Sequence, residues 1–311
     1  MQTNRIRKLL LAALMAGVAG SMSVSAALAD NVKIGFIVKF PGGFFDTLQD
    51  GGRKFAAAHP DVEIIFGQAT SATDAPGEIA LIESMITQGV QGIAITPIDA
   101  SVIPALDAAV AAGIKVVLMD NDLPDWKNKT SVVATDNFAG GKLAGEFLAK
   151  LVPAGSKVGM IAGVPGVPAL DDRLKGMQEG MGAGYTFVGG NFATKCQQEL
   201  GVKATEDMLT TNPDIKAIFG ACDGPTVGGT LAIESAGIKA GDITVVGFDG
   251  QPEAFAAITA GTMVATVVQY PANIGEYGVE TLYKALKGET VPAFVDTGTG
   301  LATKDNLADF Q

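Results

Sequence analysis

Histidine, cysteine and tryptophan are scarce in this chain, whose 311 residues include one histidine, two cysteines and one tryptophan. Catalytic triads built on His or Cys and the usual zinc sites therefore lack the residues they need. The one histidine, His59, follows a predicted helix, where a cation at the helix C-terminus explains it. Residues 163–166 are not a dinucleotide fingerprint, and the sequence has no Gly-Lys-Ser/Thr phosphate loop. Ser–Lys chemistry stays open without a supporting motif, so we expect a protein that is not an enzyme and holds no metal or cofactor.

Positive charge is scarce as well. The chain has 22 lysines and arginines against 33 aspartates and glutamates, which gives a net charge of −11. An acidic chain of this kind is a poor partner for nucleic acid or for an anionic membrane. The composition therefore argues against both partners.

The N-terminus has the pattern of a secretory signal peptide. A basic region (residues 5–8) precedes an uncharged apolar run (9–19), and Ala-Leu-Ala at 27–29 is a cleavage site of small residues. The apolar run is short for a membrane span, and no cysteine follows it to carry a lipid anchor. We expect residues 1–29 to be removed on export to a bacterial periplasm, which leaves 282 residues with a net charge of −14. A chain of that length usually forms two domains.

Two cysteines, Cys196 and Cys222, remain in the exported chain. An even number of cysteines in an oxidising compartment favours a disulfide, and two buried free thiols are the alternative. In the chain-entropy model, a bridge across this spacing stabilises the fold by about 3.5 kcal/mol.

Short β-branched runs alternate with helical patterns along nearly the whole exported chain. This alternation predicts parallel sheets with helices on both faces, a doubly wound α/β fold. The alternation pauses at a polar connection after residue 120 and then repeats, so we expect two similar lobes with a cleft between them. The expected strands are 32–39, 62–66, 92–96, 115–119, 131–134, 157–161, 185–188, 217–220, 244–248 and 263–268. The expected helices are 44–59, 75–89, 101–112, 137–151, 168–181, 196–211, 225–236, 252–260 and 272–287.

The strand 244–248 ends with an aromatic ring beside a carboxylate, Phe248 and Asp249. Ligands of open α/β sheets bind at the carboxyl ends of the strands. A flat apolar ring and a carboxylate that only accepts hydrogen bonds suit a ligand with an apolar C–H face and several hydroxyl groups. Such a ligand is a sugar or polyol. The alternative is a core Phe and an Asp that caps the next helix.

Five groups of residues follow one another in a distinctive order and spacing. They are Phe44-Phe45, Leu118-Met119-Asp120, Thr135-Asp136-Asn137 with Gly140-Gly141, Val245-Val246-Gly247-Phe248-Asp249-Gly250 and Gln269-Tyr270-Pro271. Together they resemble the periplasmic sugar-binding proteins of ABC importers, in particular the ribose-type group, over nearly all of the exported chain. The resemblance implies the type I periplasmic binding protein fold, in which two doubly wound, Rossmann-like α/β lobes are joined by a three-strand hinge and close on a monosaccharide.

The resemblance also implies lobe boundaries and partners. The N-terminal lobe would comprise 30–134 plus 270–296, and the C-terminal lobe 135–269 plus 297–311. The protein would be a monomer that presents its closed form to the membrane permease of an ABC importer. A periplasmic receptor that presents a sugar or autoinducer to a chemoreceptor or sensor kinase is the alternative, because both use the same closed form.

Carried over position by position, the resemblance implies a ligand site. Aromatic rings from both lobes would sandwich the sugar ring, carboxylates would accept its hydroxyl groups in charge-assisted bonds, and a hinge amide would contact it. These residues would be Phe44, Phe45 and Phe248, Asp120 and Asp249, and Gln269. Core packing is the alternative for the two Phe residues at 44 and 45, and a purely structural bond for the glutamine.

Several positions depart from the family pattern. The sugar-binding Arg of the second lobe is Asp171 here, with Arg173 two residues further on. Asn121 replaces the common Arg after the first carboxylate, and Lys39 stands at a usually polar position. We keep these four residues in the predicted ligand set. Because Asn cannot copy the rigid donor fork of Arg, we expect a neutral polyhydroxylated ligand other than ribose, such as a sugar alcohol or another aldose.

The two cysteines also fall at family ligand positions. Cys196 stands where the family has an aromatic residue, and Cys222 where it usually has an Asn. The resemblance places both of them on the cleft, which strengthens the expectation that they form a disulfide.

Overall fold

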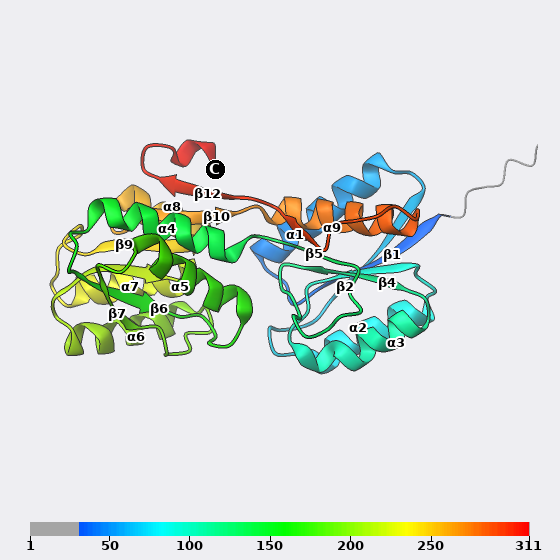
Figure 1. The fold of residues 1–311 in the computed structure, drawn as a ribbon, viewed down its shortest axis with the longest axis horizontal. Helices are drawn as coiled ribbons and strands as arrows, with labels where there is room; N and C mark the ends of the chain where they lie inside the picture. Colours follow the sequence, from blue (N-terminus) through cyan, green and yellow to red (C-terminus); the bar gives the residue numbers. More distant parts are fainter. Residues whose placement is uncertain (1–30, 311) are drawn as a thin grey trace, which may run out of the picture. The chain divides into compact units, whose positions relative to one another are not determined.

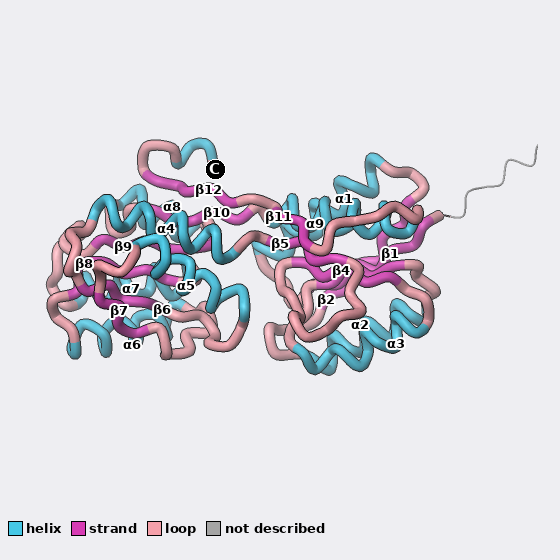
Figure 2. The backbone as a smooth tube through the Cα atoms, in the orientation of Figure 1, coloured by secondary structure: helices cyan, strands magenta, loops and turns pink. Residues whose placement is uncertain are grey.

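The computed structural model describes residues 31–310, which form two six-stranded sheets (Figures 1 and 2). The predicted signal peptide and its cleavage site lie outside the described residues. The strands of the first sheet are β1 (Val32–Val38), β2 (Val62–Gln68), β3 (Gly92–Ile95), β4 (Lys115–Met119), β5 (Ser131–Ala134) and β11 (Phe294–Asp296). Those of the second sheet are β6 (Lys157–Ile161), β7 (Thr186–Gly189), β8 (Ile215–Gly220), β9 (Thr244–Asp249), β10 (Ala265–Gln269) and β12 (Thr299–Thr303).

The two sheets have equivalent strand orders. The first has the order β11-β5-β4-β3-β1-β2, and the second has the order β12-β10-β9-β8-β6-β7. Each central pairing is parallel, and only the last strand differs, because β11 pairs parallel with β5 whereas β12 pairs antiparallel with β10. In both sheets the strand order reverses beside the first strand, which creates the switch point where ligands of doubly wound sheets bind.

Helices cover both faces of the first sheet. The helices packed on it are α1 (Gly43–Ala58), α2 (Ala75–Thr87), a short 3-10 turn η1 (Ala100–Val102), α3 (Ile103–Ala111) and α9 (Pro271–Leu286), the last of which follows β10 of the second sheet. Alternate residues of β4 point to opposite faces, so that Val116 and Leu118 join the core under α2 and α3, whereas Val117 and Met119 join the core under α1 and α9. Apart from the exposed Lys115 at its start, the strand is apolar because both of its faces are buried.

The second sheet is covered in the same way. Its helices are α4 (Asn137–Leu151), α5 (Pro168–Met181), α6 (Gln198–Thr211), α7 (Asp223–Ser235), α8 (Pro252–Ala260) and the 3-10 turn η2 (Leu307–Asp309). On β9, Val246 and Phe248 join the core under α4 and α5, whereas Val245 joins the core under α6, α7 and α8. These two sheets with helices on both faces confirm the predicted doubly wound α/β fold.

Three segments of the chain pass from one sheet to the other. They connect β5 to α4, β10 to α9, and β11 to β12. Two hydrogen bonds join the first and third segments, from the Thr297 N–H to the Ala134 carbonyl at 3.1 Å and from the Asp136 N–H to Asp296 Oδ1 at 3.1 Å. The lobe boundaries that the resemblance implies, after residues 134, 269 and 296, stay a prediction.

Helix α6 begins two residues later than the sequence predicts. The expected start was Cys196, but Lys195 and Cys196 have φ angles of 52° and 54°, in the left-handed region that an α-helix does not use. The helix therefore begins at Gln198. Apolar periodicity does not register such a local backbone conformation, and the prediction of the start was wrong for that reason.

Helices α4 and α5 lie side by side and touch through glycines (Figure 1). A Cβ atom on Gly141 or Gly145 would overlap the carbonyl of Arg173 or Met177 on the facing helix. Gly176 of α5 approaches the Phe138 carbonyl of α4 in the same way. Close backbone packing therefore accounts for Gly141, which a helix N-terminal anion site would otherwise explain.

Replacing Gly145 by alanine is expected to destabilise the protein by about 1–3 kcal/mol, because the new methyl group overpacks a backbone contact that cannot yield easily. Urea unfolding followed by circular dichroism measures the change. Gly43→Ala is the control, since Gly43 is also helical and has no atom within 4 Å of the position its Cβ would take. Equal stability of the two variants would contradict the proposed role of the glycine contact.

Candidate functional site

An ion pair lies at the carboxyl end of β9. Arg173 of α5 donates from Nη1 to Asp249 Oδ1 at 2.8 Å and to the Ala221 carbonyl at 2.8 Å, and from Nε to Asn137 Oδ1 at 2.8 Å. Gln269, the last residue of β10, donates from Nε2 to the same Asp249 oxygen at 2.7 Å. Three other residues, Asn137, Ala221 and Gln269, thus fix one guanidinium and one carboxylate. We call this group the Arg173 cluster.

The Phe248 ring packs against Arg173. The Arg173 guanidinium carbon lies 3.9 Å from the centre of the Phe248 ring, a cation–π contact. The ring is fully buried in the core, and Gly140 of α4 lies against its edge, since a Cβ there would come within 2.8 Å of Cζ. The side chain that the resemblance implies as a sugar-stacking ring is therefore covered on one face by Arg173. The Phe248 ring thus orients the Arg173 guanidinium.

Asp223 lies behind the Arg173 cluster, at the start of α7. Its carboxylate accepts bonds from the Gly250 N–H and the Gln251 N–H, both at 2.8 Å, and from the Thr266 hydroxyl at 2.7 Å. Burial, followed by the nearby charge of Asp249, raises the pKa of Asp223 to about 7, and the three hydrogen bonds oppose that rise. This carboxyl group holds the loop that follows β9.

Asp249 itself is subject to opposing effects. Burial raises its pKa, whereas the charge of Arg173 and the bonds from Gln269 and Arg173 lower it. Its φ angle is 131°, a conformation that side chains other than glycine rarely adopt. Strained backbone of this kind is concentrated at functional sites, where the surrounding structure holds it in place.

The corresponding strand of the first sheet ends in a second ion pair. Asp120 follows β4, has a φ angle of 64°, and places Oδ2 3.7 Å from Lys39 Nζ. Lys39 follows β1, and its N–H donates to the Thr96 hydroxyl oxygen at 3.0 Å. Burial lowers the pKa of Lys39, and the charge of Asp120 opposes this. Because β4 and β9 occupy equivalent places in their sheets, Asp120 and Asp249 are topological counterparts. We call this second group the Lys39 cluster.

A buried glutamate completes the Lys39 cluster. Glu78 of α2 is fully buried, its Oε2 accepts the Ile98 N–H at 2.8 Å, and its Oε1 has no hydrogen-bond partner among residues 31–310. Burial raises its pKa to about 7, and the charge of Lys39 acts in the opposite direction. No sequence signal singles out Glu78, because an acidic residue in the first turn of a helix is already explained by the helix dipole.

The remaining predicted ligand residues differ in exposure. Phe45 is 7% exposed and packs edge-on against Phe40 and Phe44, with ring centres 4.7 and 5.2 Å away. Phe44 is only partly buried. Asn121 lies beside Asp120 and places Nδ2 3.5 Å from the Pro97 carbonyl. Asp171 accepts the Gly166 N–H with both carboxylate oxygens, at 3.2 and 3.1 Å, and so closes the loop that precedes α5.

The two cysteines are bonded to each other, as expected, with Cα atoms 5.5 Å apart.

The structure gathers the predicted ligand residues into two groups, one at the carboxyl edge of each sheet. The first contains Lys39, Phe44, Phe45, Asp120 and Asn121, and the second contains Asp171, Arg173, Phe248, Asp249 and Gln269.

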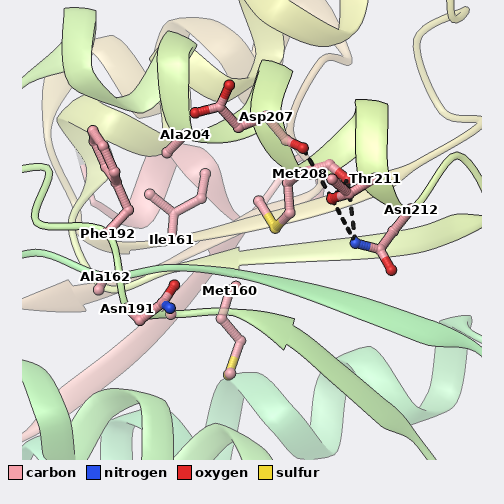
Figure 3. Close-up of a pocket in the computed structure, with 12 residues that line it drawn as sticks. Met160, Ile161, Ala162, Asn191, Phe192, Ala204, Asp207, Met208, Thr211 and Asn212 are labelled. Atoms are coloured by element: carbon pink, nitrogen blue, oxygen red, sulfur yellow. Dashed lines mark hydrogen bonds between the residues drawn. The ribbon is translucent and has the colours of Figure 1, made fainter.

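A separate cavity of about 310 Å³ lies beside the edge strand β7 (Figure 3). Its walls come from the end of β6, the loop after β7 and helix α6, and they include Met160, Phe192 and Met208. In Figure 3 the Asn212 amide turns back onto the end of α6, where it donates to the Met208 carbonyl and the Thr211 hydroxyl oxygen. None of the predicted ligand residues lines this cavity.

Residues 31–310 contain neither a candidate metal site nor a candidate membrane span. In that part of the chain, no three His, Cys, Asp or Glu side chains are grouped so that they could hold a metal ion. Nor does a helix within it have the length and apolar character needed to cross a membrane.

Comparison with known proteins identifies the family. The sequence profile described as "Periplasmic binding protein domain" matches residues 34–290. The chain is 32% identical over 286 residues to the Ribose import binding protein RbsB of Escherichia coli (strain K12), an alignment that covers 91% of this chain and 94% of that protein. The chain belongs to the periplasmic binding protein family, and the resemblance noted from its motifs is confirmed.

Solved structures agree with this assignment. An ABC transporter solute-binding protein from Agrobacterium vitis with bound D-fucose is 31% identical and superposes with a TM-score of 0.79, over 88% of this chain and 96% of that one. A solute-binding protein from Bacillus halodurans with bound myo-inositol is 26% identical, with a TM-score of 0.81 and coverage of 91% and 98%. The predicted type I periplasmic binding protein fold is confirmed, and these relatives are binding proteins of transport systems rather than enzymes.

Proposed function

We propose that this chain binds a neutral monosaccharide or sugar alcohol in a bacterial periplasm and delivers it to the permease of an ABC importer. The observation that carries this proposal is the matched pair of strand-end ion pairs, Lys39 with Asp120 and Arg173 with Asp249, in a chain of the periplasmic binding protein family. The predicted signal peptide supports the location.

The chemistry of the two clusters favours a neutral ligand. In each ion pair one cation lies against one strand-end carboxylate, so the pair itself carries no net charge that would select an ionic ligand. The ammonium and guanidinium groups donate hydrogen bonds, and the carboxylates accept them. A polyol presents hydroxyl groups that can both donate and accept, and it can therefore bond to all four side chains. A hydroxyl group bonded to an ionised side chain forms a stronger hydrogen bond than a neutral pair does.

We further propose that the two clusters close on the ligand through the three connecting segments. The lobes would be residues 30–134 plus 270–296 and residues 135–269 plus 297–311. Strand membership supports this division, because β11 belongs to the first sheet and β12 to the second. Hinge closure of this kind brings two half-sites together around a bound molecule.

Within the site, the side chains would divide into contacts and supports. Phe44, which is only partly buried, would lie against the C–H face of the ligand, while Phe45 holds it in place through its edge-on contact. Asn121 and Gln269 would add an amide group from each side. Phe248 and Asp171 would act through the orientation of Arg173 and of its loop, because the first is buried beneath the guanidinium and the second is engaged by Gly166.

The relatives narrow the ligand class. Those with a bound molecule include holders of D-fucose, D-allose, D-arabinose and myo-inositol, all of which are neutral and polyhydroxylated. Their names describe parts of import systems, and no observation favours the sensory alternative. The monomeric state stays a prediction.

A thermal-shift panel tests the proposal. We expect at least one neutral aldose or cyclic or acyclic polyol at 1 mM to raise the unfolding temperature, because a ligand at about 100 times its Kd adds about 2.7 kcal/mol to the stability of the folded state. Amino acids and phosphorylated sugars form the control set. Stabilisation by these ionic compounds, with no effect of any neutral sugar or polyol, would refute the proposed ligand class.

A further inference from the structure

The disulfide joins two segments at the carboxyl edge of the second sheet. Cys222 is buried, follows β8, and stands at the N-cap of α7. Cys196 is exposed and lies in the loop that precedes α6. The bridge spans 26 residues of sequence. Its position at the strand ends raises the question of what it fixes there.

Residues 221–223 contact Arg173 and also the loop that follows Asp249. The Ala221 carbonyl accepts from Arg173 Nη1 at 2.8 Å. Two residues later, the Asp223 carboxylate holds the N–H groups of Gly250 and Gln251, which follow Asp249. Cys222 stands between these two residues. A shift of the backbone at Cys222 would therefore move the acceptor of Arg173 and the anchor of the Asp249 loop together.

The partner segment is held in an unfavourable conformation. Lys195 and Cys196 are consecutive residues other than glycine with positive φ angles, and both are exposed. Apart from the disulfide, two bonds tie this loop to the end of β6, from the Lys195 N–H to the Gly163 carbonyl at 3.0 Å and from the Thr194 hydroxyl to the Ala162 carbonyl at 2.5 Å. A backbone conformation of this kind persists only where the surroundings enforce it.

The sulfur atoms also pack beside the helix that carries Arg173. A Cβ atom on Gly163 would lie 3.0 Å from Cys196 Sγ, 3.1 Å from Cys222 Sγ and 2.6 Å from Leu170 Cδ1. Leu170 is in the first turn of α5, three residues before Arg173. The bridge thus touches the loop between β6 and α5 as well as the end of β8. Both of these segments position the guanidinium.

We propose that the Cys196–Cys222 disulfide is a positioning element of the ligand site, which holds residues 221–223 so that Arg173 and Asp249 keep their geometry before the ligand arrives. The inference rests on the proposed function, since it concerns the same site. It adds that ligand affinity depends on the oxidised state of the bridge. A preorganised site binds more tightly because fewer groups must be ordered on binding.

The test compares three proteins: the oxidised wild type, the double variant C196A/C222A, and the variant V158A as a matched control. Val158 is a fully buried residue of β6 that pairs with Phe187 of β7 and Ala217 of β8, so V158A is expected to lower the stability of the same lobe without removing a hydrogen bond, an ion pair or the disulfide. Isothermal titration with a sugar or polyol found in the thermal-shift panel gives the affinities. We expect C196A/C222A to bind about tenfold or more weakly than the wild type, and V158A to bind normally.

Hydrogen exchange of the ligand-free proteins gives a second readout. The Gly250 and Gln251 amides, both bonded to Asp223, should exchange faster in C196A/C222A than in the wild type, while in V158A they should change no more than the other amides of the lobe. If the double variant does not fold, the wild type treated with a small dithiol replaces it. In that reaction the dithiol gives two electrons and two protons to the bridge, becomes a cyclic disulfide, and leaves two protein thiols.

The outcomes are separable. Unchanged affinity or unchanged exchange in C196A/C222A overturns the inference, and so does an equal loss of affinity in V158A, which would assign the effect to general stability. If no neutral sugar or polyol binds the wild type, the proposed function fails, and the exchange measurement still decides the role of the bridge.

Discussion

Asp249→Asn is expected to weaken ligand binding by about 100-fold or more, because it removes the charge from the carboxylate to which Arg173 and Gln269 both donate hydrogen bonds. The loss has two sources. The ligand hydroxyl groups would lose a charge-assisted acceptor, and the Arg173 guanidinium, whose side chain is 6% exposed, would be left without its counter-ion. Removing one partner of a buried pair costs about 3–5 kcal/mol, part of which would appear as lower stability.

Titration calorimetry and thermal unfolding of the same variant separate these two effects. Asp214→Asn is the control, because Asp214 forms an ion pair with Lys157 at 2.9 Å on the surface of the same lobe and is 62% exposed. This change should leave the affinity unaltered. Affinity of Asp249→Asn within twofold of the wild type would show that the Arg173 cluster is not the ligand site.

The stability of the protein is expected to fall as the pH rises from about 5 to about 7. Glu78 and Asp223 each have a pKa raised to about 7 by burial, from ordinary values of 4.5 and 3.8. A raised pKa means that the folded state binds the proton more tightly than the unfolded state does. Its contribution to stability is complete below the ordinary pKa and is lost as the pH rises through the raised value. Each group can change the free energy of unfolding by up to about 1.4 kcal/mol per pH unit in this window.

Urea unfolding at pH 5, 6, 7 and 8 measures this dependence. Glu78 faces Lys39, Asp74 and Asp99, and Asp223 faces Asp249, so these are the charges that set each titration. Glu78→Gln and Asp223→Asn should each flatten the profile, because an amide does not titrate. Asp214→Asn should not flatten it, since the pKa of Asp214 is lowered by Lys157 and its effect lies at more acidic pH. A wild-type profile that is flat or rises between pH 5 and 7 would contradict the assignment.

Much of the fold can be predicted from the sequence because both sheets are buried on two faces. Strands such as β4 and β9 then contain runs of consecutive apolar residues, and amphipathic helices separate the strands, so that the alternation is visible without any alignment. Several helices have the predicted bounds, among them α4, which begins after the N-cap residue Asp136, and α5, which begins with Pro168. The start of α6 was missed because it depends on two left-handed residues held by contacts distant in sequence.

The site was predicted less completely than the fold. The sequence shows that Asp249 and Gln269 stand at strand ends. It does not show that Gln269 and Arg173 both donate to Asp249, since Arg173 comes from a helix and lies 76 residues before Asp249 in the chain. The absence of an Arg at position 171 indicated a missing donor, and the structure places the guanidinium of Arg173 next to Asp249. Phe248 illustrates the same limit, since a strand-end aromatic residue can face a ligand or a cation with the same local sequence.

The last strands of the two sheets have a consequence for how the chain is completed. β11 and β12 are separated by two residues near the C-terminus, yet one pairs with β5 and the other with β10. Each sheet lacks one of its two edge strands until this short segment is in place, and contacts of such long sequence separation form slowly. We therefore expect both sheets to be completed together, when this one stretch of chain pairs with β5 and with β10.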